Sequence, residues 1–143
     1  MVWRNLNRIY LLDEDGVRVA EVPRRAVRSD LPLVVGVGAD AAMLEAREIY
    51  SILAPLESRV LGLVRMGARR WDVVLENKVI SLPAAGGADA LRTLMALQAR
   101  HGILEKDASI IDMRDANRMI LRLSEEALNE LRSARGRALG ERV

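Results

Sequence analysis

The chain has 143 residues, the size of one ordinary domain, and is long enough to bury a stable core without disulfide bonds or a structural metal ion. It has no cysteine, so a disulfide framework and a thiolate zinc site are excluded. The net charge is only +2, aromatic residues make up 3% of the chain and phenylalanine is absent, a composition that argues against a nucleic-acid-binding surface.

The first elements are a predicted hairpin and a strand. Residues 8–12 form an apolar run, and residues 17–22 alternate apolar and polar side chains. Asp15 and Gly16 stand between them and are typical of a tight hairpin turn. A loop rich in arginine follows and is expected to be solvated, and Leu31 then begins an apolar strand.

A glycine motif lies between that strand and the first predicted helix. Gly36, Gly38 and Ala41 fill the pattern G-x-G-x-x-A, which can hold a pyrophosphate at a helix N-terminus. However, Asp40 is expected at the N-cap of a helix over residues 40–53, where its carboxylate would repel a phosphate. No acidic residue follows at the end of a second strand about twenty residues on, as a dinucleotide site needs. We favour a turn followed by an N-cap; the alternative is a nucleotide-binding enzyme domain that uses Gly36 and Gly38.

The middle of the chain predicts a meander and a second helix. Strands are expected over residues 59–66 and 70–75 and again from Val79, with short turns between them. Such consecutive strands make a largely antiparallel sheet. A second amphipathic helix begins near Asp89 and ends at Gly102.

The last part of the chain predicts two strands and a helix. The strands cover residues 109–113 and 118–123, and a helix begins after Ser124, which is a good N-cap. Residues 132–143 have little apolar surface and are expected to fray. The predicted fold class is therefore α+β: a mostly antiparallel, strongly twisted β-sheet with two covering helices and a C-terminal helix.

Residues suited to catalysis or metal binding are sparse. The only histidine, His101, lies in the last turn of the second helix, where a positive charge suits the helix dipole. Glu105 and Asp107 follow it across a helix end and a loop, a spacing that does not favour a metal site. We predict no catalytic residue, no metal site and no cofactor.

The strand over residues 118–123 is the strongest candidate for binding. It has apolar residues on both faces, and an exposed edge strand with free N–H and C=O groups can add a strand from a partner. In the alternative interpretation, Ile120 fills the core and the C-terminal helix covers the edge. The pattern by itself favours neither interpretation.

Three stretches resemble a known family. They are Gly-Ala-Arg-Arg-Trp-Asp-Val-Val-Leu-Glu-Asn at residues 67–77, Val-Ile-Ser-Leu-Pro at residues 79–83 and Ile-Asp-Met-Arg at residues 111–114. In this order they are similar to the FtsQ/DivIB family of bacterial cell-division proteins.

The resemblance implies a domain division and a location. Residues 1–6 would be the remnant of the end of a preceding POTRA domain, residues 7–124 the FtsQ-type β domain, and residues 125–143 a C-terminal helix and frayed tail. Family members have one inner-membrane span, which this chain lacks, and they act on the periplasmic side at the division septum. The fragment itself is expected to be soluble, and its strand at residues 2–5 is expected to have lost its neighbour.

The resemblance also implies a non-catalytic scaffold of the divisome with FtsB-like and FtsL-like partners, bound by strand addition to the last strand. Arg114 is expected to meet an acidic residue of the incoming segment, with Arg69 and Arg70 beside it, because arginine pairs bidentately with carboxylates. The complete set of predicted partner-binding residues is Arg69, Arg70, Arg114, Arg118, Met119, Ile120, Leu121, Arg122 and Leu123.

Overall fold

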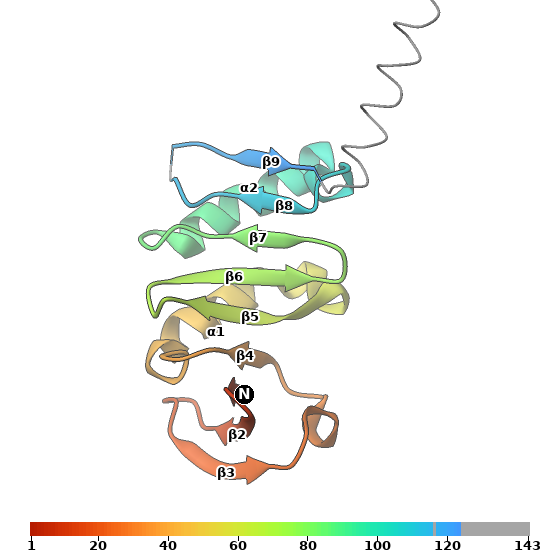
Figure 1. Cartoon of the computed structure of the whole chain (residues 1–143). Coiled ribbons are helices and arrows are strands. Elements are labelled where there is room, and N and C mark those ends of the chain that lie inside the picture. The colour runs from red at the N-terminus through yellow and green to blue at the C-terminus, as the bar shows by residue number, and fades with distance from the viewer. Residues whose placement is uncertain (116, 124–143) are drawn as a thin grey trace, which may run out of the picture.

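The computed structural model describes residues 1–115 and 117–123, which form one nine-stranded sheet and two α-helices (Figure 1). The strands are β1 (Val2–Asn5), β2 (Arg8–Leu12), β3 (Arg18–Val22), β4 (Leu33–Val35), β5 (Val60–Met66), β6 (Arg70–Leu75), β7 (Val79–Ser81), β8 (Ile110–Asp112) and β9 (Ile120–Arg122). The helices are α1 (Met43–Ile52) and α2 (Gly87–His101). The spatial order of the strands is β3-β2-β1-β4-β5-β6-β7-β8-β9, so β3 and β9 form the two edges.

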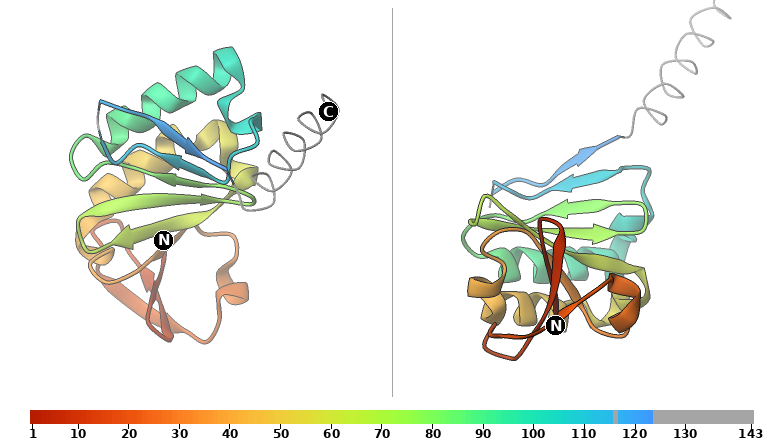
Figure 2. Two further views of the ribbon diagram at one scale, coloured as in Figure 1. Left: turned by 45° about the horizontal axis from the view of Figure 1, so that its top comes forward. Right: turned by 60° about the horizontal axis from the view of Figure 1, so that its bottom comes forward.

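The sheet is mixed, and the prediction of a mostly antiparallel sheet is wrong. The pairs β1–β4, β4–β5 and β7–β8 are parallel, whereas the other five neighbouring pairs are antiparallel. The physical reason is that each helix serves as a crossover: α1 connects β4 to β5, and α2 connects β7 to β8, as parallel neighbours require. Figure 2 shows both helices on the same face of the sheet.

The core lies between that face and the helices. Strand residues alternate between the two faces of a sheet, so every second residue of β6 is buried beneath the helices. The fully buried side chains of this layer include Leu63, Trp71, Val73, Ile80 and Ile111 from the strands and Ala46, Ile49, Leu91 and Leu94 from the helices. This core holds β5 to β8 in a fixed order, which leaves β9 as the outermost strand.

The first strand is an interior strand of the sheet. β1 pairs with β2 on one side and with β4 on the other, and its Val2 and Trp3 are buried. The Trp3 indole N–H donates to the Gly36 carbonyl at 2.9 Å. The expectation that this strand lacks a neighbour is therefore wrong, because β4 supplies the second partner. The assignment of residues 1–6 to a preceding domain stays a prediction.

Both internal helices are confirmed, but the predicted cap of the first is wrong. Asp40 lies in a 3₁₀ turn, Asp40–Ala42, and the N-cap of α1 is Ala42, which makes no side-chain cap. α2 ends at Gly102, whose φ of +57° gives the left-handed conformation that glycine adopts without strain. The predicted C-terminal helix and tail lie outside the described residues.

Candidate functional site

The free side of β9 is defined by its main-chain groups. Directly after β8, the Met113 N–H donates to the Ser81 carbonyl of β7 at 2.8 Å. Neighbouring residues of a strand direct their main-chain groups to opposite sides, so Asp112 faces β9, where it pairs with Ile120. The next residue, Leu121, therefore directs its N–H and C=O away from β8, where the described part of the chain places no further strand.

The side chains of β9 alternate between the two faces of the sheet. Leu121 lies opposite the buried Ile111 and thus on the helix-covered face, whereas Ile120 and Arg122 lie on the other face. Ile120 and Leu121 are 36% and 37% exposed. The interpretation in which Ile120 fills the core is therefore wrong, because Leu121 occupies the core-facing position.

A buried carboxylate stands beneath this strand. Asp112 is 5% exposed and accepts hydrogen bonds from Arg114 Nε at 2.9 Å and Nη2 at 2.7 Å, as well as from the Arg114 main-chain N–H. Arg122 Nη2 donates to the same carboxylate at 3.1 Å. The hydrogen bonds from Arg114 hold the pKa of Asp112 far below its usual range. Asp112 thus ties the loop after β8 to the edge strand.

A hollow of about 420 Å³ lies beside these groups. It is lined by Asp112, Arg114, Asp115, Arg118, Ile120 and Arg122, so three guanidinium groups meet two carboxylates. Arg114 is already bound to Asp112, although its side chain is half exposed. The hollow therefore combines an excess of positive charge with the apolar surface of Ile120, next to the free main-chain groups of β9.

The other two predicted arginines lie on a different hairpin. Arg69 and Arg70 line a separate hollow of about 340 Å³ at the turn between β5 and β6. Arg70 forms an ion pair with Asp72, which stands in register with Ser81 of β7. The structure thus gathers Arg114, Arg118, Ile120 and Arg122 around one hollow but leaves Arg69 and Arg70 outside it.

Three of the predicted contact residues near this strand lie outside β9: Arg118, Met119 and Leu123. Met119 precedes the strand and packs against the core, whereas Leu123 follows the strand and is 41% exposed. The strand is therefore shorter than the six residues predicted. Met119 and Leu123 remain next to the free edge because they adjoin Ile120 and Arg122 in the chain.

The glycine motif serves packing. The Gly36 N–H donates to the Arg4 carbonyl of β1 at 2.9 Å, so this amide is not available to a phosphate. A Cβ atom at Gly36 would lie 2.7 Å from the Arg65 carbonyl oxygen, and the residue has a φ of +109°. Both facts explain the glycine without a nucleotide.

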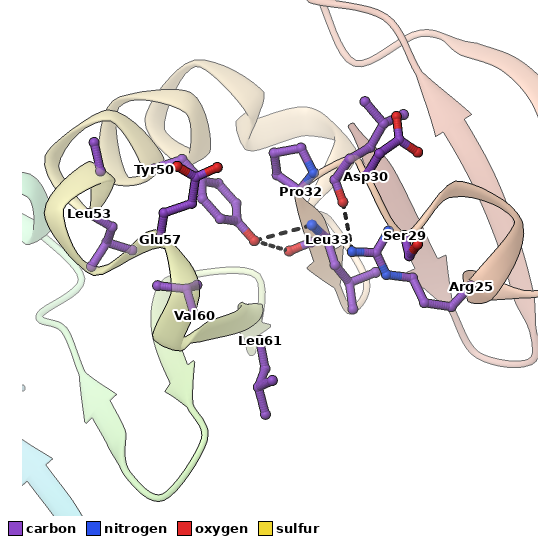
Figure 3. Close-up of a pocket in the computed structure, with 12 residues that line it drawn as sticks. Arg25, Ser29, Asp30, Pro32, Leu33, Tyr50, Leu53, Glu57, Val60 and Leu61 are labelled. Atoms are coloured by element: carbon purple, nitrogen blue, oxygen red, sulfur yellow. Dashed lines mark hydrogen bonds between the residues drawn. The ribbon is translucent and has the colours of Figure 1, made fainter.

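The sequence reasoning missed a second polar site, which lies around Tyr50. Its hydroxyl donates to the Leu33 carbonyl at 2.6 Å and accepts from the Leu33 N–H at 3.2 Å (Figure 3). Burial raises the pKa of Tyr50 to about 12. A hollow of about 380 Å³ opens beside it, and Arg25 on its far wall donates to the main-chain carbonyls of Arg28 and Leu31 rather than remaining solvated.

The role of Asp112 was missed because its position in the strand pattern predicts exposure. It alternates with Ile111 and Met113, which points it to the face without helices. Its burial comes from the two arginines that cover it, one of which is ten residues away in sequence. The only signal in the sequence was an aspartate inside an apolar strand, followed two positions later by an arginine.

Residues 1–115 and 117–123 contain neither a cluster of side chains that could hold a metal ion nor a membrane-spanning helix. Within these ranges, no group of three or more His, Asp or Glu side chains is arranged to hold a metal ion. Over the same residues, no helix has the length and apolar character needed to cross a membrane.

Comparisons with known proteins identify similar chains. Residues 1–114 match the family model described as cell division protein FtsQ/DivIB, C-terminal. A protein of Ketogulonicigenium vulgare named cell division protein FtsQ is 41% identical over 140 residues, which cover 97% of this chain and 46% of that protein. Proteins of the same name from Paracoccus denitrificans and Rhizobium meliloti are 44% and 32% identical over 95% and 89% of this chain, and 40% and 41% of their own lengths. The chain thus spans less than half the length of these relatives.

Proposed function

Because this chain belongs to the FtsQ/DivIB family of cell division proteins, we propose that its β9 edge binds a strand of an FtsB-like partner. The role is non-catalytic scaffolding of the divisome, with an FtsL-like protein held in the same assembly. The domain acts on the periplasmic side of the inner membrane at the division septum, and residues 7–124 are the unit that binds.

The observation that carries this proposal is the orientation of Leu121. Its N–H and C=O point to the free side of β9. Main-chain hydrogen bonds supply the affinity in strand addition, and pockets for alternate side chains supply the specificity. An added strand that pairs with Leu121 would bury apolar area on both faces of the sheet.

The charge around the edge favours an acidic partner segment. Three arginines and two aspartates line the hollow beside β9, so a carboxylate of the incoming strand would meet a positive field. Arg114 and Arg122 are both half exposed and already oriented by Asp112. Such orientation reduces the side-chain entropy that an arginine loses when it binds a carboxylate.

The test is binding of this chain to the periplasmic segment of the FtsB-like protein from the same organism. Leu121→Pro removes a main-chain donor that faces the partner and no donor that faces β8. We expect it to weaken binding by about tenfold or more, since a lost hydrogen bond leaves an unpaired acceptor in the interface. Titration calorimetry measures the Kd, and urea unfolding confirms that each variant is folded.

Two variants serve as matched controls. Leu121→Ala shortens the side chain but keeps the N–H, so the difference between the proline and alanine variants isolates the main-chain bond. Val19→Pro places a proline in the opposite edge strand, at a residue with no partner in the register of β2 and β3, and should leave the Kd unchanged.

Amide hydrogen exchange on the unmodified chain gives a second measurement. Saturating partner segment should slow exchange at Leu121 and leave the rate at Glu21 of the other edge unchanged. An unchanged Kd for a folded Leu121→Pro variant, or protection on the β3 edge instead, would contradict the proposal.

A further inference from the structure

The free edge of β9 has the geometry to pair with β9 of a second copy of this chain. Figure 1 shows β9 as the outermost strand at one end of the sheet, and its register with β8 is uninterrupted. Leu121 directs its N–H and C=O away from β8. Two copies related by a twofold axis would place their Leu121 residues opposite each other and exchange both main-chain hydrogen bonds.

On the helix-covered face of the sheet, this self-pairing would be favourable. Leu121 of one copy would face Leu121 of the other, and Met119 would face Leu123. Leu121 is 37% exposed and Leu123 is 41% exposed, so both would lose contact with water. The main-chain hydrogen bonds and this apolar area would together stabilise a dimer.

On the face without helices, the same pairing would bring like charges together. Arg118 lines the hollow with Ile120 and Arg122, which places it on this face. Ile120 would lie opposite Arg122 of the second copy, so the diagonal neighbours of that arginine would be Arg118 and Arg122. Diagonal neighbours are about 7 to 8 Å apart, within reach of long side chains. The guanidinium groups of the two copies would therefore repel each other.

The carboxylates beside these arginines are already engaged within their own chain. Asp112 binds Arg114 and Arg122, and Asp115 accepts the main-chain N–H of the residue two positions later at 3.0 Å. The side chain of Arg118 is exposed and makes no ion pair within residues 1–115 and 117–123. A second copy would thus add cations to an edge that already carries an excess of them.

We propose that Arg118 and Arg122 are specificity residues that exclude a second copy of this chain from the β9 edge. The main chain of the edge attracts any strand, whereas the two arginines repel a strand that carries cations and favour one that carries carboxylates. This exclusion rests on the same free edge as the proposed function, but not on the identity of the partner.

The test is self-association of the full chain with no partner present, measured by sedimentation equilibrium over a range of concentrations. Arg118→Glu converts two like-charge pairs of the dimer into two opposite-charge pairs. We expect the unmodified chain to be a monomer and the variant to have a dimer dissociation constant lower by about tenfold or more. Urea unfolding confirms that each variant is folded.

Two further variants are matched controls. Arg47→Glu reverses an exposed arginine of α1 and lowers the net charge from +2 to 0, as Arg118→Glu does, because each replaces one cation by one anion. It should remain monomeric, which separates position from net charge. Adding Leu121→Pro to Arg118→Glu should restore the monomer, because proline removes the main-chain donor that joins the two copies.

Salt separates the effect of charge from that of apolar contact. Between about 0.1 and 1 M salt, the screening length falls from about 10 to about 3 Å. Self-association of the unmodified chain should therefore rise with salt, whereas that of Arg118→Glu should fall. A folded Arg118→Glu variant that stays monomeric, a dimer that survives Leu121→Pro, or equal dimerisation of Arg47→Glu would each overturn the proposal. None of these results depends on whether an FtsB-like segment binds.

Discussion

The two edges of the sheet are built differently, although both are short strands with one neighbour among the described residues. β3 carries a bulge, because the register shifts where Val19 is left without a partner, and Arg18 folds back over the rings of Trp3 and Tyr10. β9 keeps an uninterrupted register with β8. Bulges and charged residues are common means of keeping a sheet edge from pairing with other chains. Among the described residues, the β3 edge is therefore irregular, whereas the β9 edge is regular.

The edges also differ in what fixes them to the sheet. Under β9, the buried Asp112 binds two arginines, one in the preceding loop and one in the strand itself. At β3, Arg18 lies with its guanidinium carbon 5.0 Å from the Trp3 ring centroid and 4.6 Å from that of Tyr10. The first arrangement is a hydrogen-bonded network around a buried charge, and the second is cation–π stacking over rings. Their loss should therefore have different costs.

The largest effect is expected at Asp112. Asp112→Ala removes the acceptor for Arg114 and Arg122 and should lower the free energy of unfolding by about 2 to 3 kcal/mol. The substitution should also raise the rate of amide hydrogen exchange in β9 and leave the rate in β3 unchanged. Urea unfolding and exchange measured by mass spectrometry check both statements. An equal change in the amide exchange rates of β9 and β3 would contradict the proposed difference between the two edges.

Low pH should reduce the contribution of Asp112 to the free energy of unfolding. The pKa of Asp112 is lower in the folded chain than in the unfolded one, because Arg114 and Arg122 favour the charged carboxylate. The stabilisation by Asp112 is therefore complete above the pKa of the unfolded chain, roughly 3.9. It is lost as the pH falls through the lower pKa of the folded chain. The stability difference between the unmodified chain and Asp112→Ala should shrink progressively below about pH 4. A difference that stays constant down to pH 2 would argue that the carboxylate is not the source of the stabilisation.

The smallest effect is expected at the protected edge. Arg18→Ala removes the cation that lies over the two rings and should cost about 0.5 to 1 kcal/mol of stability. The matched change Arg18→Lys keeps a cation and should recover part of that loss. A loss of stability comparable to that of Asp112→Ala would contradict the expected difference between the two edges.

Local sequence signals gave correct elements where neighbouring residues decide the structure. The β2–β3 hairpin follows from Asp15 and Gly16, and the Asp13 carboxylate accepts from the Asp15 and Val17 N–H groups at 2.9 Å. β6 has the predicted bounds because it alternates buried and exposed residues without interruption. The cap of α1 failed, since Asp40 entered a 3₁₀ turn that no pattern of apolar residues indicates.

Local patterns and short motifs in the sequence indicate both internal helices, the β2–β3 hairpin, the family and a strand near residues 118–123. The parallel pairings, the burial of Asp112 and the side of β9 on which Leu121 presents its main-chain groups depend instead on contacts between distant segments. The reason is that periodicity reports contacts within a strand or helix, whereas pairing direction and burial depend on segments that are distant in sequence. Arg122 covers Asp112 from ten residues away, and β1 pairs with β4 across about thirty residues of chain.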